Sequence, residues 1–312
     1  MDERKLITTL AGGVGAAKFL QGLVNILNEE ICVIVNTGDD IELHGLYVSP
    51  DIDIVIYTLA GLVNEDQGWG IKGDTFHCLK MLENYGHKPW FRLGDLDLAT
   101  HINRTSLMKQ GLKLSEITKQ ECDLLDVKAK IIPMTDNRVS TMVHTDQGIL
   151  NFQEYLVKRG ATDKVLNVEF KGIDKAFPAP DIINNIERSR GIIVCPSNPI
   201  VSIGTILSVP GIKESLLSTK ATIIGISPII AGLPVKGPAD KIMRGLGLEV
   251  SAYQVAKLYS SFLDIFVLDV SDHKLVSKIE QLGIKVIMAQ TLMKSIKEKK
   301  ELAKIVLKAL ER

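Results

Sequence analysis

The sequence has no excess of charge of either sign, because its 37 Lys and Arg residues balance its 37 Asp and Glu residues. A balanced chain produces no overall field that would attract nucleic acid or an anionic membrane surface. We therefore expect no nucleic acid and no membrane as a partner. The partners that we expect are small-molecule substrates, bound at one localised site on the protein.

Cysteine is scarce, and no Cys-x-x-Cys pair or Cys/His cluster joins the four cysteines (Cys32, Cys78, Cys122 and Cys195). Scattered cysteines of this kind are typical of reduced thiols in a cytoplasmic protein. The charged start, Met1 to Arg4, leads directly into a predicted strand, so we expect no signal peptide. The pattern indicates a cytoplasmic location.

Long apolar runs are also lacking. The longest, residues 221–235, is too short to cross a bilayer and contains Pro228, Gly232 and Pro234. Hydrophobic residues nevertheless make up 46% of the chain and charged residues 24%, which predicts a sizeable core. A length of 312 residues allows one large α/β domain or two of ordinary size.

A glycine loop stands between a predicted strand, Lys5 to Leu10, and a predicted helix, Ala16 to Asn25. The loop reads Ala11-Gly12-Gly13-Val14-Gly15, and its glycines permit both a tight turn and the close approach of an anion. Backbone N–H groups at the start of such a helix form a phosphate site. The alternative is a turn whose glycines only allow close packing of strand and helix.

The loop departs from both common phosphate motifs. Lys18 stands where the dinucleotide fingerprint has its third glycine, and no Gly-Lys-Ser/Thr closes a P-loop. Our prediction is a phosphate site of another kind.

Strands and helices alternate along most of the chain. Apolar strands are predicted at 31–35, 130–133, 191–195, 221–226, 264–268 and 285–289, and a hairpin at 142–152. Residues 50–127 contain several predicted helices and no clear strand. We predict an α/β fold in which a Rossmann-like, mostly parallel sheet has helices on both faces (residues 1–49 and 128–312), with 50–127 as a smaller helical insertion or cap over the sheet.

In such sheets ligands bind outside the carboxyl ends of the strands. Here those ends carry the glycine loop, Asp39-Asp40, Ser197-Asn198 and Ser227-Pro228. Carboxylates near a phosphate loop indicate a hard cation such as Mg²⁺, shared with phosphate oxygens. The carboxylates in question are Asp39, Asp40, Asp51, Asp53, Asp95 and Asp97. For Asp51, Asp95 and Asp97, capping or a helix dipole is an equally good explanation.

Two further features indicate ligand recognition. Trp69, between Gly68 and Gly70, has a ring that would stack on a planar ligand or serve as a packing anchor. Ser197-Asn198, held between two prolines, offers donors and acceptors suited to a nucleobase edge, or simply caps a helix.

The motifs in order resemble the 2-phospho-L-lactate transferases, which make the deazaflavin coenzyme F(420). The segments that carry the resemblance are Ala11 to Lys18, Val35 to Asp40, Ser49 to Asp53, Gly68 to Gly70, Leu93 to His101, Pro196 to Gly204 and Ser227 to Ile230.

The resemblance implies transfer of a 2-phospholactyl or enolpyruvyl phosphate group. The donor is a guanosine diphosphate derivative (LPPG or EPPG), the acceptor is the ribityl hydroxyl of the deazaflavin Fo, and the products are coenzyme F(420)-0 and GMP. Mg²⁺ is expected on Asp39 and Asp53, Fo near Asp53, Arg92 and Trp69, and the protein as a homodimer. The donor is expected at Gly12, Gly13, Gly15, Lys18, Asn36, Ser197 and Asn198. If a general base exists, Asp53 or Asp51 is our candidate.

Two other functions use a similar loop. A nicotinamide-dependent oxidoreductase would need the third glycine, and an acid where Asn36 stands. A nucleotide-sugar-binding regulator of the gluconeogenesis-factor type shares the loop, but the segments around Trp69 and Arg92 suit an aromatic acceptor and favour the transferase.

Overall fold

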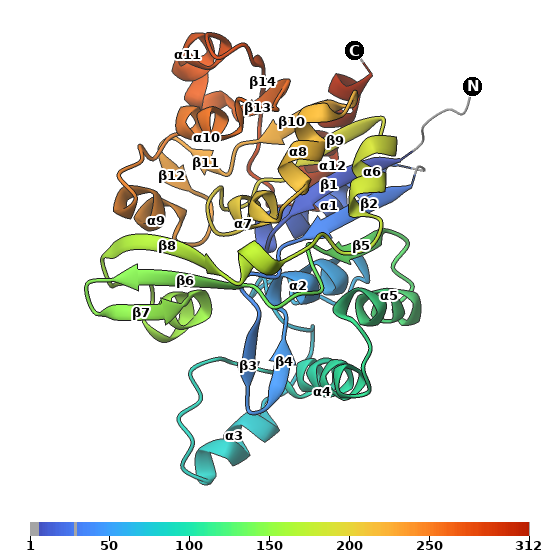
Figure 1. The fold of residues 1–312 in the computed structure, drawn as a ribbon, viewed down its shortest axis with the longest axis vertical. Coiled ribbons are helices and arrows are strands. Elements are labelled where there is room, and N and C mark those ends of the chain that lie inside the picture. The colour runs from blue at the N-terminus through green and yellow to red at the C-terminus, as the bar shows by residue number, and fades with distance from the viewer. Residues whose placement is uncertain (1–5, 28–29, 312) are drawn as a thin grey trace.

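Seven parallel strands form the central sheet of the protein (Figure 1). The computed structural model describes residues 6–27 and 30–311; Met1 to Lys5 and Arg312, which belong to predicted terminal segments, lie outside the described residues. The sheet order is β14-β13-β10-β9-β1-β2-β5. Its strands are β1 (Ile7–Ala11), β2 (Ile31–Val35), β5 (Lys130–Pro133), β9 (Gly191–Val194), β10 (Thr222–Ile226), β13 (Ile265–Asp269) and β14 (Lys285–Ala289).

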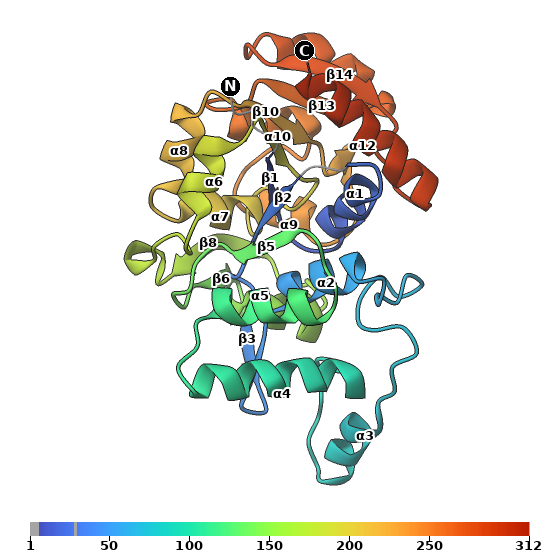
Figure 2. The ribbon, with the colours of Figure 1, turned by 90° about the vertical axis from the view of Figure 1, so that its right-hand side faces the viewer.

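Helices cover both faces of this sheet (Figure 2). One face packs against α1 (Val14–Val24), α2 (Pro50–Leu59), α5 (Leu114–Leu124) and α12 (Ile296–Leu310). The other packs against α6 (Ile182–Arg188), α7 (Ile203–Ser208), α8 (Ile212–Ser218), α9 (Ala239–Gly245), α10 (Ala252–Tyr259) and α11 (Val276–Glu280). The strands of the sheet interior are mostly apolar because both of their faces are buried, and Thr8 and Thr9 of β1 are buried with them. The predicted α/β fold is confirmed.

The segment 50–127 contributes helices, and no strand, to the structure around the central sheet. Besides α2 and α5 it contains α3 (His77–Asn84) and α4 (Asp95–Lys109), which lie beyond the end of the sheet. Because α2 and α5 share the core with α1 and α12, this segment joins the sheet through apolar side chains. No helix in the part of the chain that the structure describes has the length and apolarity needed to cross a membrane.

The sequence analysis missed two antiparallel units. A hairpin of β3 (Ile41–Leu43) and β4 (Leu46–Val48) extends from the sheet toward α4, and β11 (Ile229–Ile230) pairs with β12 (Leu233–Pro234). The predicted hairpin of β6 (Ser140–Thr145) and β7 (Gly148–Asn151) exists, but β8 (Val165–Lys171) adds a third strand to it. Three of the seven residues of β8 (Asn167, Glu169 and Lys171) are exposed and polar, and Leu166 is exposed as well, so its apolar signal is weak.

The segment between β13 and β14 is not one continuous helix. A 3₁₀ segment, Val270–Leu275, precedes α11, and Asp272 within it has non-helical dihedral angles. The Asp272 carboxylate accepts the backbone N–H of Ala231 at 2.9 Å, a long-range contact that local propensity does not show. Two other short helical turns are π-helical Glu154–Lys158 and 3₁₀ Ile173–Lys175.

The chain reverses its direction across the sheet between β1 and β9. From β1 it builds outward through β2 and β5, and it then returns to β9 and builds outward on the other side. Loops diverge at such a point, which is where open α/β sheets bind ligands. The glycine loop follows β1 and the segment from Cys195 follows β9, so both flank this switch point.

Candidate active site

The glycine loop is joined directly to the loop after β9. The backbone N–H of Gly12 donates to Ser197 Oγ at 3.1 Å. This N–H group of the loop is therefore bonded within the protein. The N–H groups of the first turn of α1 have no acceptor within the helix, and such groups are the donors that a helix N-terminus offers to an anion.

The three glycines of the loop have different neighbours. A Cβ on Gly15 would lie 2.2 Å from the Pro196 carbonyl oxygen, and one on Gly12 would lie 2.5 Å from Ser202 Oγ. On Gly13 a Cβ would meet a carboxylate oxygen of Asp51 at 3.0 Å. Gly12 and Gly15 therefore serve close packing, the alternative that the sequence left open, whereas Gly13 faces an acidic side chain.

Four buried aspartates, Asp39, Asp40, Asp51 and Asp53, gather beside this loop, and we call them the acidic cluster. Asp39 and Asp40 follow β2, whereas Asp51 and Asp53 lie in the first turn of α2. Repulsion from Asp51 and Asp40 acts on Asp39, and repulsion from Asp53 acts on Asp51. The structure thus places the two predicted metal ligands, Asp39 and Asp53, in one cluster with Asp51 and Asp40.

Asp39 is the least compensated member of the cluster. Its Oδ1 is buried without a hydrogen-bond partner. Burial, followed by repulsion from Asp51 and Asp40, raises the pKa of Asp39 well above its usual value. An unpartnered buried oxygen beside other carboxylates is suited to a cation.

Asp40 and Asp51 accept hydrogen bonds from neutral polar side chains. Asp40 accepts from Ser49 Oγ and Tyr47 Oη, each at 2.7 Å, and burial raises its pKa to about 8. Asp51 Oδ2 accepts from Asn36 Nδ2 at 3.0 Å, and burial raises its pKa to about 6. Ser49 precedes α2, but its side chain bonds Asp40 and not the helix N-terminus.

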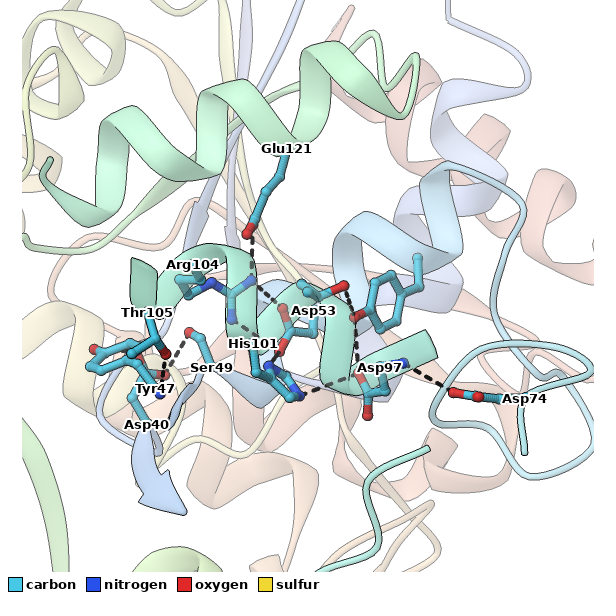
Figure 3. Close-up of polar contacts among 12 residues, drawn as sticks. Asp40, Tyr47, Ser49, Asp53, Asp74, Asp97, His101, Arg104, Thr105 and Glu121 are labelled. Carbon is cyan, nitrogen blue, oxygen red and sulfur yellow. Dashed lines mark hydrogen bonds and ion pairs between the residues drawn. The ribbon is translucent and has the colours of Figure 1, made fainter. Parts of the chain in front are cut away.

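Asp53 is paired with a buried arginine that the sequence analysis did not single out (Figure 3). Arg104 of α4 donates from Nη1 to Asp53 Oδ2 at 3.2 Å and from Nη2 to Asp53 Oδ1. The same Nη2 donates to Glu121 Oε2 of α5 at 2.8 Å. Burial lowers the pKa of Arg104, but Asp53 and Glu121 outweigh it and raise that pKa well above its usual value.

His101 lies between Asp53 and Asp97, as Figure 3 shows. Its Nδ1 is 3.7 Å from Asp53 Oδ2 and its Nε2 is 3.4 Å from Asp97 Oδ1, and neither contact is a hydrogen bond. Asp97 also accepts from Tyr57 Oη at 2.9 Å. Buried contacts of this kind connect α4 to α2.

Asp95 and Asp74 cap each other's helices. The Asp95 carboxylate accepts the backbone N–H groups of His77 and Cys78, where α3 begins. Asp74 in turn accepts the N–H groups of Leu96 and Asp97, in the first turn of α4. Asp95 therefore caps a helix, which was one of its two explanations, but the helix it caps is α3 and not its own helix, α4.

Trp69 and Arg92, both predicted near the acceptor, lie together. The Arg92 guanidinium is 5.9 Å from the centre of the Trp69 ring and 4.5 Å from that of Phe76. Gly68 and Gly70, on either side of Trp69, both have positive φ angles (69° and 70°), which only glycine adopts easily. Arg92 is exposed, so this group borders solvent.

The remaining donor candidates surround the loop. Asn198 accepts the N–H groups of Ile200 and Val201 with Oδ1, and its buried Nδ2 has no partner. Lys18 is half-buried, and its charge acts on Glu65 and on Lys236. Whether these residues bind a donor stays a prediction.

A cavity of about 710 Å³ lies between the hairpin β3–β4 and the sheet β6–β8, and Asp40 of the acidic cluster lines it. Asp40, Trp90, Arg138, Met142 and Lys171 are among its lining residues.

Within residues 6–27 and 30–311, no three His, Cys, Asp or Glu side chains are placed to hold a metal ion together. A cation at the acidic cluster would therefore take one or two protein carboxylates and complete its coordination shell from water and phosphate, as Mg²⁺ commonly does.

The fold and this site define an α/β protein that presents buried carboxylates beside a glycine loop at a topological switch point. The family model described as 2-phospho-L-lactate transferase CofD matches residues 7–305. The chain belongs to this family, and it is therefore a transferase enzyme.

Two relatives illustrate the range of the family. The chain is 41% identical over 301 residues to a 2-phospho-L-lactate transferase of Methanosarcina mazei, covering 96% of this chain and 98% of the relative. It is 44% identical over 285 residues to a phosphoenolpyruvate transferase of Streptomyces coelicolor, covering 89% of each.

Among solved structures, a member of the UPF0052 family from Bacillus halodurans is similar in fold. Its TM-score is 0.63 at 16% sequence identity, covering 98% of this chain and all of that one. At this identity the similarity concerns the fold alone.

Proposed function

We propose that this transferase moves a 2-phospholactyl or enolpyruvyl phosphate group from a guanosine diphosphate donor to the ribityl hydroxyl of Fo. The products are coenzyme F(420)-0, or its dehydro form, and GMP. One observation carries the proposal: the unpartnered carboxylate oxygen of Asp39 lies in a cluster that also contacts the glycine loop. Such a site suits a diphosphate whose charge a cation neutralises.

The donor diphosphate fits against the start of α1, where orphan N–H groups and the helix dipole favour an anion. The Asp51 carboxylate stands beside Gly13, so a diphosphate alone would meet a negative charge there. A divalent cation between carboxylates and phosphate oxygens removes this conflict. Asn198, with its free buried Nδ2, is our candidate for the guanosine end.

Mg²⁺ would be held by Asp39 and Asp53, and it would supply charge neutralisation on the leaving phosphate. The residues fit this role. Asp39 has an orphan oxygen, and Asp53 keeps carboxylate lone pairs that its contacts with Arg104 leave unused.

The chain's own contribution is to orient the groups that react. Positioning an acceptor hydroxyl in line with phosphorus supplies up to roughly 7–11 kcal/mol in favourable cases. A strong base is not required when the transition state is loose. If one acts, Asp53 or Asp51 is the candidate, and the ring of the acceptor stacks near Trp69 and Arg92.

The decisive experiment mixes the protein, Mg²⁺, Fo and the guanylylated donor, and detects GMP and a phosphodiester-bearing deazaflavin by mass spectrometry. Separate reactions with the lactyl and the enolpyruvyl donor determine which one is used. Asp39→Ala should lower turnover by about 100-fold or more, as expected when an electrostatic stabiliser is lost. Wild-type turnover in this variant would contradict the site assignment.

Binding measurements address the alternative function. A nucleotide-sugar-binding regulator should bind a UDP-sugar more tightly than GDP, and the transferase should show the reverse preference. We also propose that the protein is a homodimer and that it is cytoplasmic. Light scattering on the purified protein tests the homodimer.

A further inference from the structure

Arg104 belongs to none of the motifs that identify the family, yet it is 0% exposed and is among the largest fully buried side chains. A charged side chain is almost never fully buried unless it is paired. Its guanidinium is paired on two sides, with Asp53 of α2 and with Glu121 of α5. These two partners suggest two different roles, which experiments can separate.

The contact with Asp53 fixes an orientation. Nη1 and Nη2 each donate to a different oxygen of the same carboxylate, so the guanidinium and carboxylate planes are held together. Such bidentate pairs add geometric specificity, which a single ammonium group does not supply. The carboxylate keeps lone pairs beyond those that the two bonds use.

The charges around Asp53 make this orientation necessary. Asp53 repels Asp51 and Asp40, whereas Arg104 contributes a positive charge that acts on Asp40 as well. His101 Nδ1 at 3.7 Å borders Asp53 without a hydrogen bond. With Arg104 absent, repulsion would favour rotation of the Asp53 carboxylate away from the acidic cluster.

We propose that Arg104 is a positioning residue, which holds the Asp53 carboxylate in the orientation that presents its free lone pairs to the reacting groups. This inference rests on the proposed function. The competing role is purely structural: through Glu121, the guanidinium would only connect α4 to α5.

The test compares Arg104→Lys with Glu121→Gln. Lysine keeps the positive charge but loses the planar fork, so the bidentate contact with Asp53 is lost. Glutamine keeps an oxygen for Arg104 but removes the charge of the second partner, and it leaves the contact with Asp53 intact. Measurements are kcat, KM for donor and acceptor, thermal unfolding, and crystal structures of both variants.

We expect Arg104→Lys to lower kcat by about 100-fold, the cost of a misplaced group, with KM for the donor within threefold of wild type. The Asp53 carboxylate should turn in this variant. Glu121→Gln should keep kcat within threefold and the wild-type orientation of Asp53, even where its melting temperature falls.

Two results would overturn the inference: wild-type kcat in folded Arg104→Lys, or an equal loss of kcat in Glu121→Gln. If Arg104→Lys does not fold, a loss of kcat of about 100-fold in folded Glu121→Gln overturns the inference by itself. Absence of turnover in the wild-type protein would contradict the proposed function instead, and the orientation of Asp53 in the variant crystals would still decide the role of Arg104.

Discussion

Gly12 donates its backbone N–H to the hydroxyl of Ser197, a residue 185 positions later in the chain. The bond connects the loop after β1 to the loop after β9, on the two sides of the switch point. Both groups are buried, so neither has water as an easy substitute. The glycine loop therefore owes its shape to a distant partner as well as to its own sequence.

This bond gives a first prediction. Ser197→Ala leaves the Gly12 N–H buried without an acceptor, which should cost about 1–3 kcal/mol of unfolding free energy. Urea denaturation measures the loss. Ser218→Ala, which removes a hydroxyl bonded locally to the Ser215 carbonyl, is the control and should change the free energy much less.

The glycines of the loop should respond differently to alanine. Gly15→Ala places a Cβ against the Pro196 carbonyl oxygen and should destabilise the protein by about 1–3 kcal/mol, the usual cost of overpacking. Gly13→Ala meets only the Asp51 carboxylate, so it should lower the affinity for GDP with a smaller loss of stability. Calorimetric titration with GDP and thermal melts measure the two effects, and identical behaviour of both variants would contradict this division of roles.

The two tryptophans of the chain test where the aromatic acceptor binds. Trp69→Ala should raise KM for Fo by about tenfold, because stacking on an aromatic side chain contributes about 1–3 kcal/mol. Trp90→Ala, beside the cavity next to the β3–β4 hairpin, is the matched control and should leave KM within about threefold. The reverse result would place the acceptor ring in that cavity.

Stability of the metal-free protein should fall as the pH rises from about 4 to 8. Burial raises the pKa of Asp51 to about 6 and that of Asp40 to about 8 in the folded state, from an ordinary value of 3.8. Between these values the folded state binds more protons than the unfolded state, so the unfolding free energy decreases with pH.

Urea denaturation in EDTA at pH 5 and pH 8 measures this slope. Asp40→Asn removes one of the groups that titrate and should flatten the decline above pH 6, and added Mg²⁺ should restore stability at pH 8 if it binds the acidic cluster. A wild-type protein that becomes more stable between pH 5 and pH 8 in EDTA would contradict the raised pKa values.

The sequence alone determined the central sheet and the edge at which the glycine loop and the aspartates meet. Apolar strands alternating with helices predict a parallel sheet because each strand must be buried on both faces. Glycines after β1 and aspartates after β2 fall at carboxyl ends of strands, so one edge of the sheet had to collect them. These inferences need only local patterns and a rule of topology, and the family resemblance added the chemistry.

Tertiary structure decided what surrounds those residues. Arg104 is 51 positions from Asp53 and has no local signal that separates it from an ordinary helical arginine. The N–H of Gly12 is bonded by Ser197, and β8 joins the hairpin through pairing with β6. Such partners are chosen by packing between distant segments, where burial makes each polar group require a partner. That requirement appears only once the chain has folded.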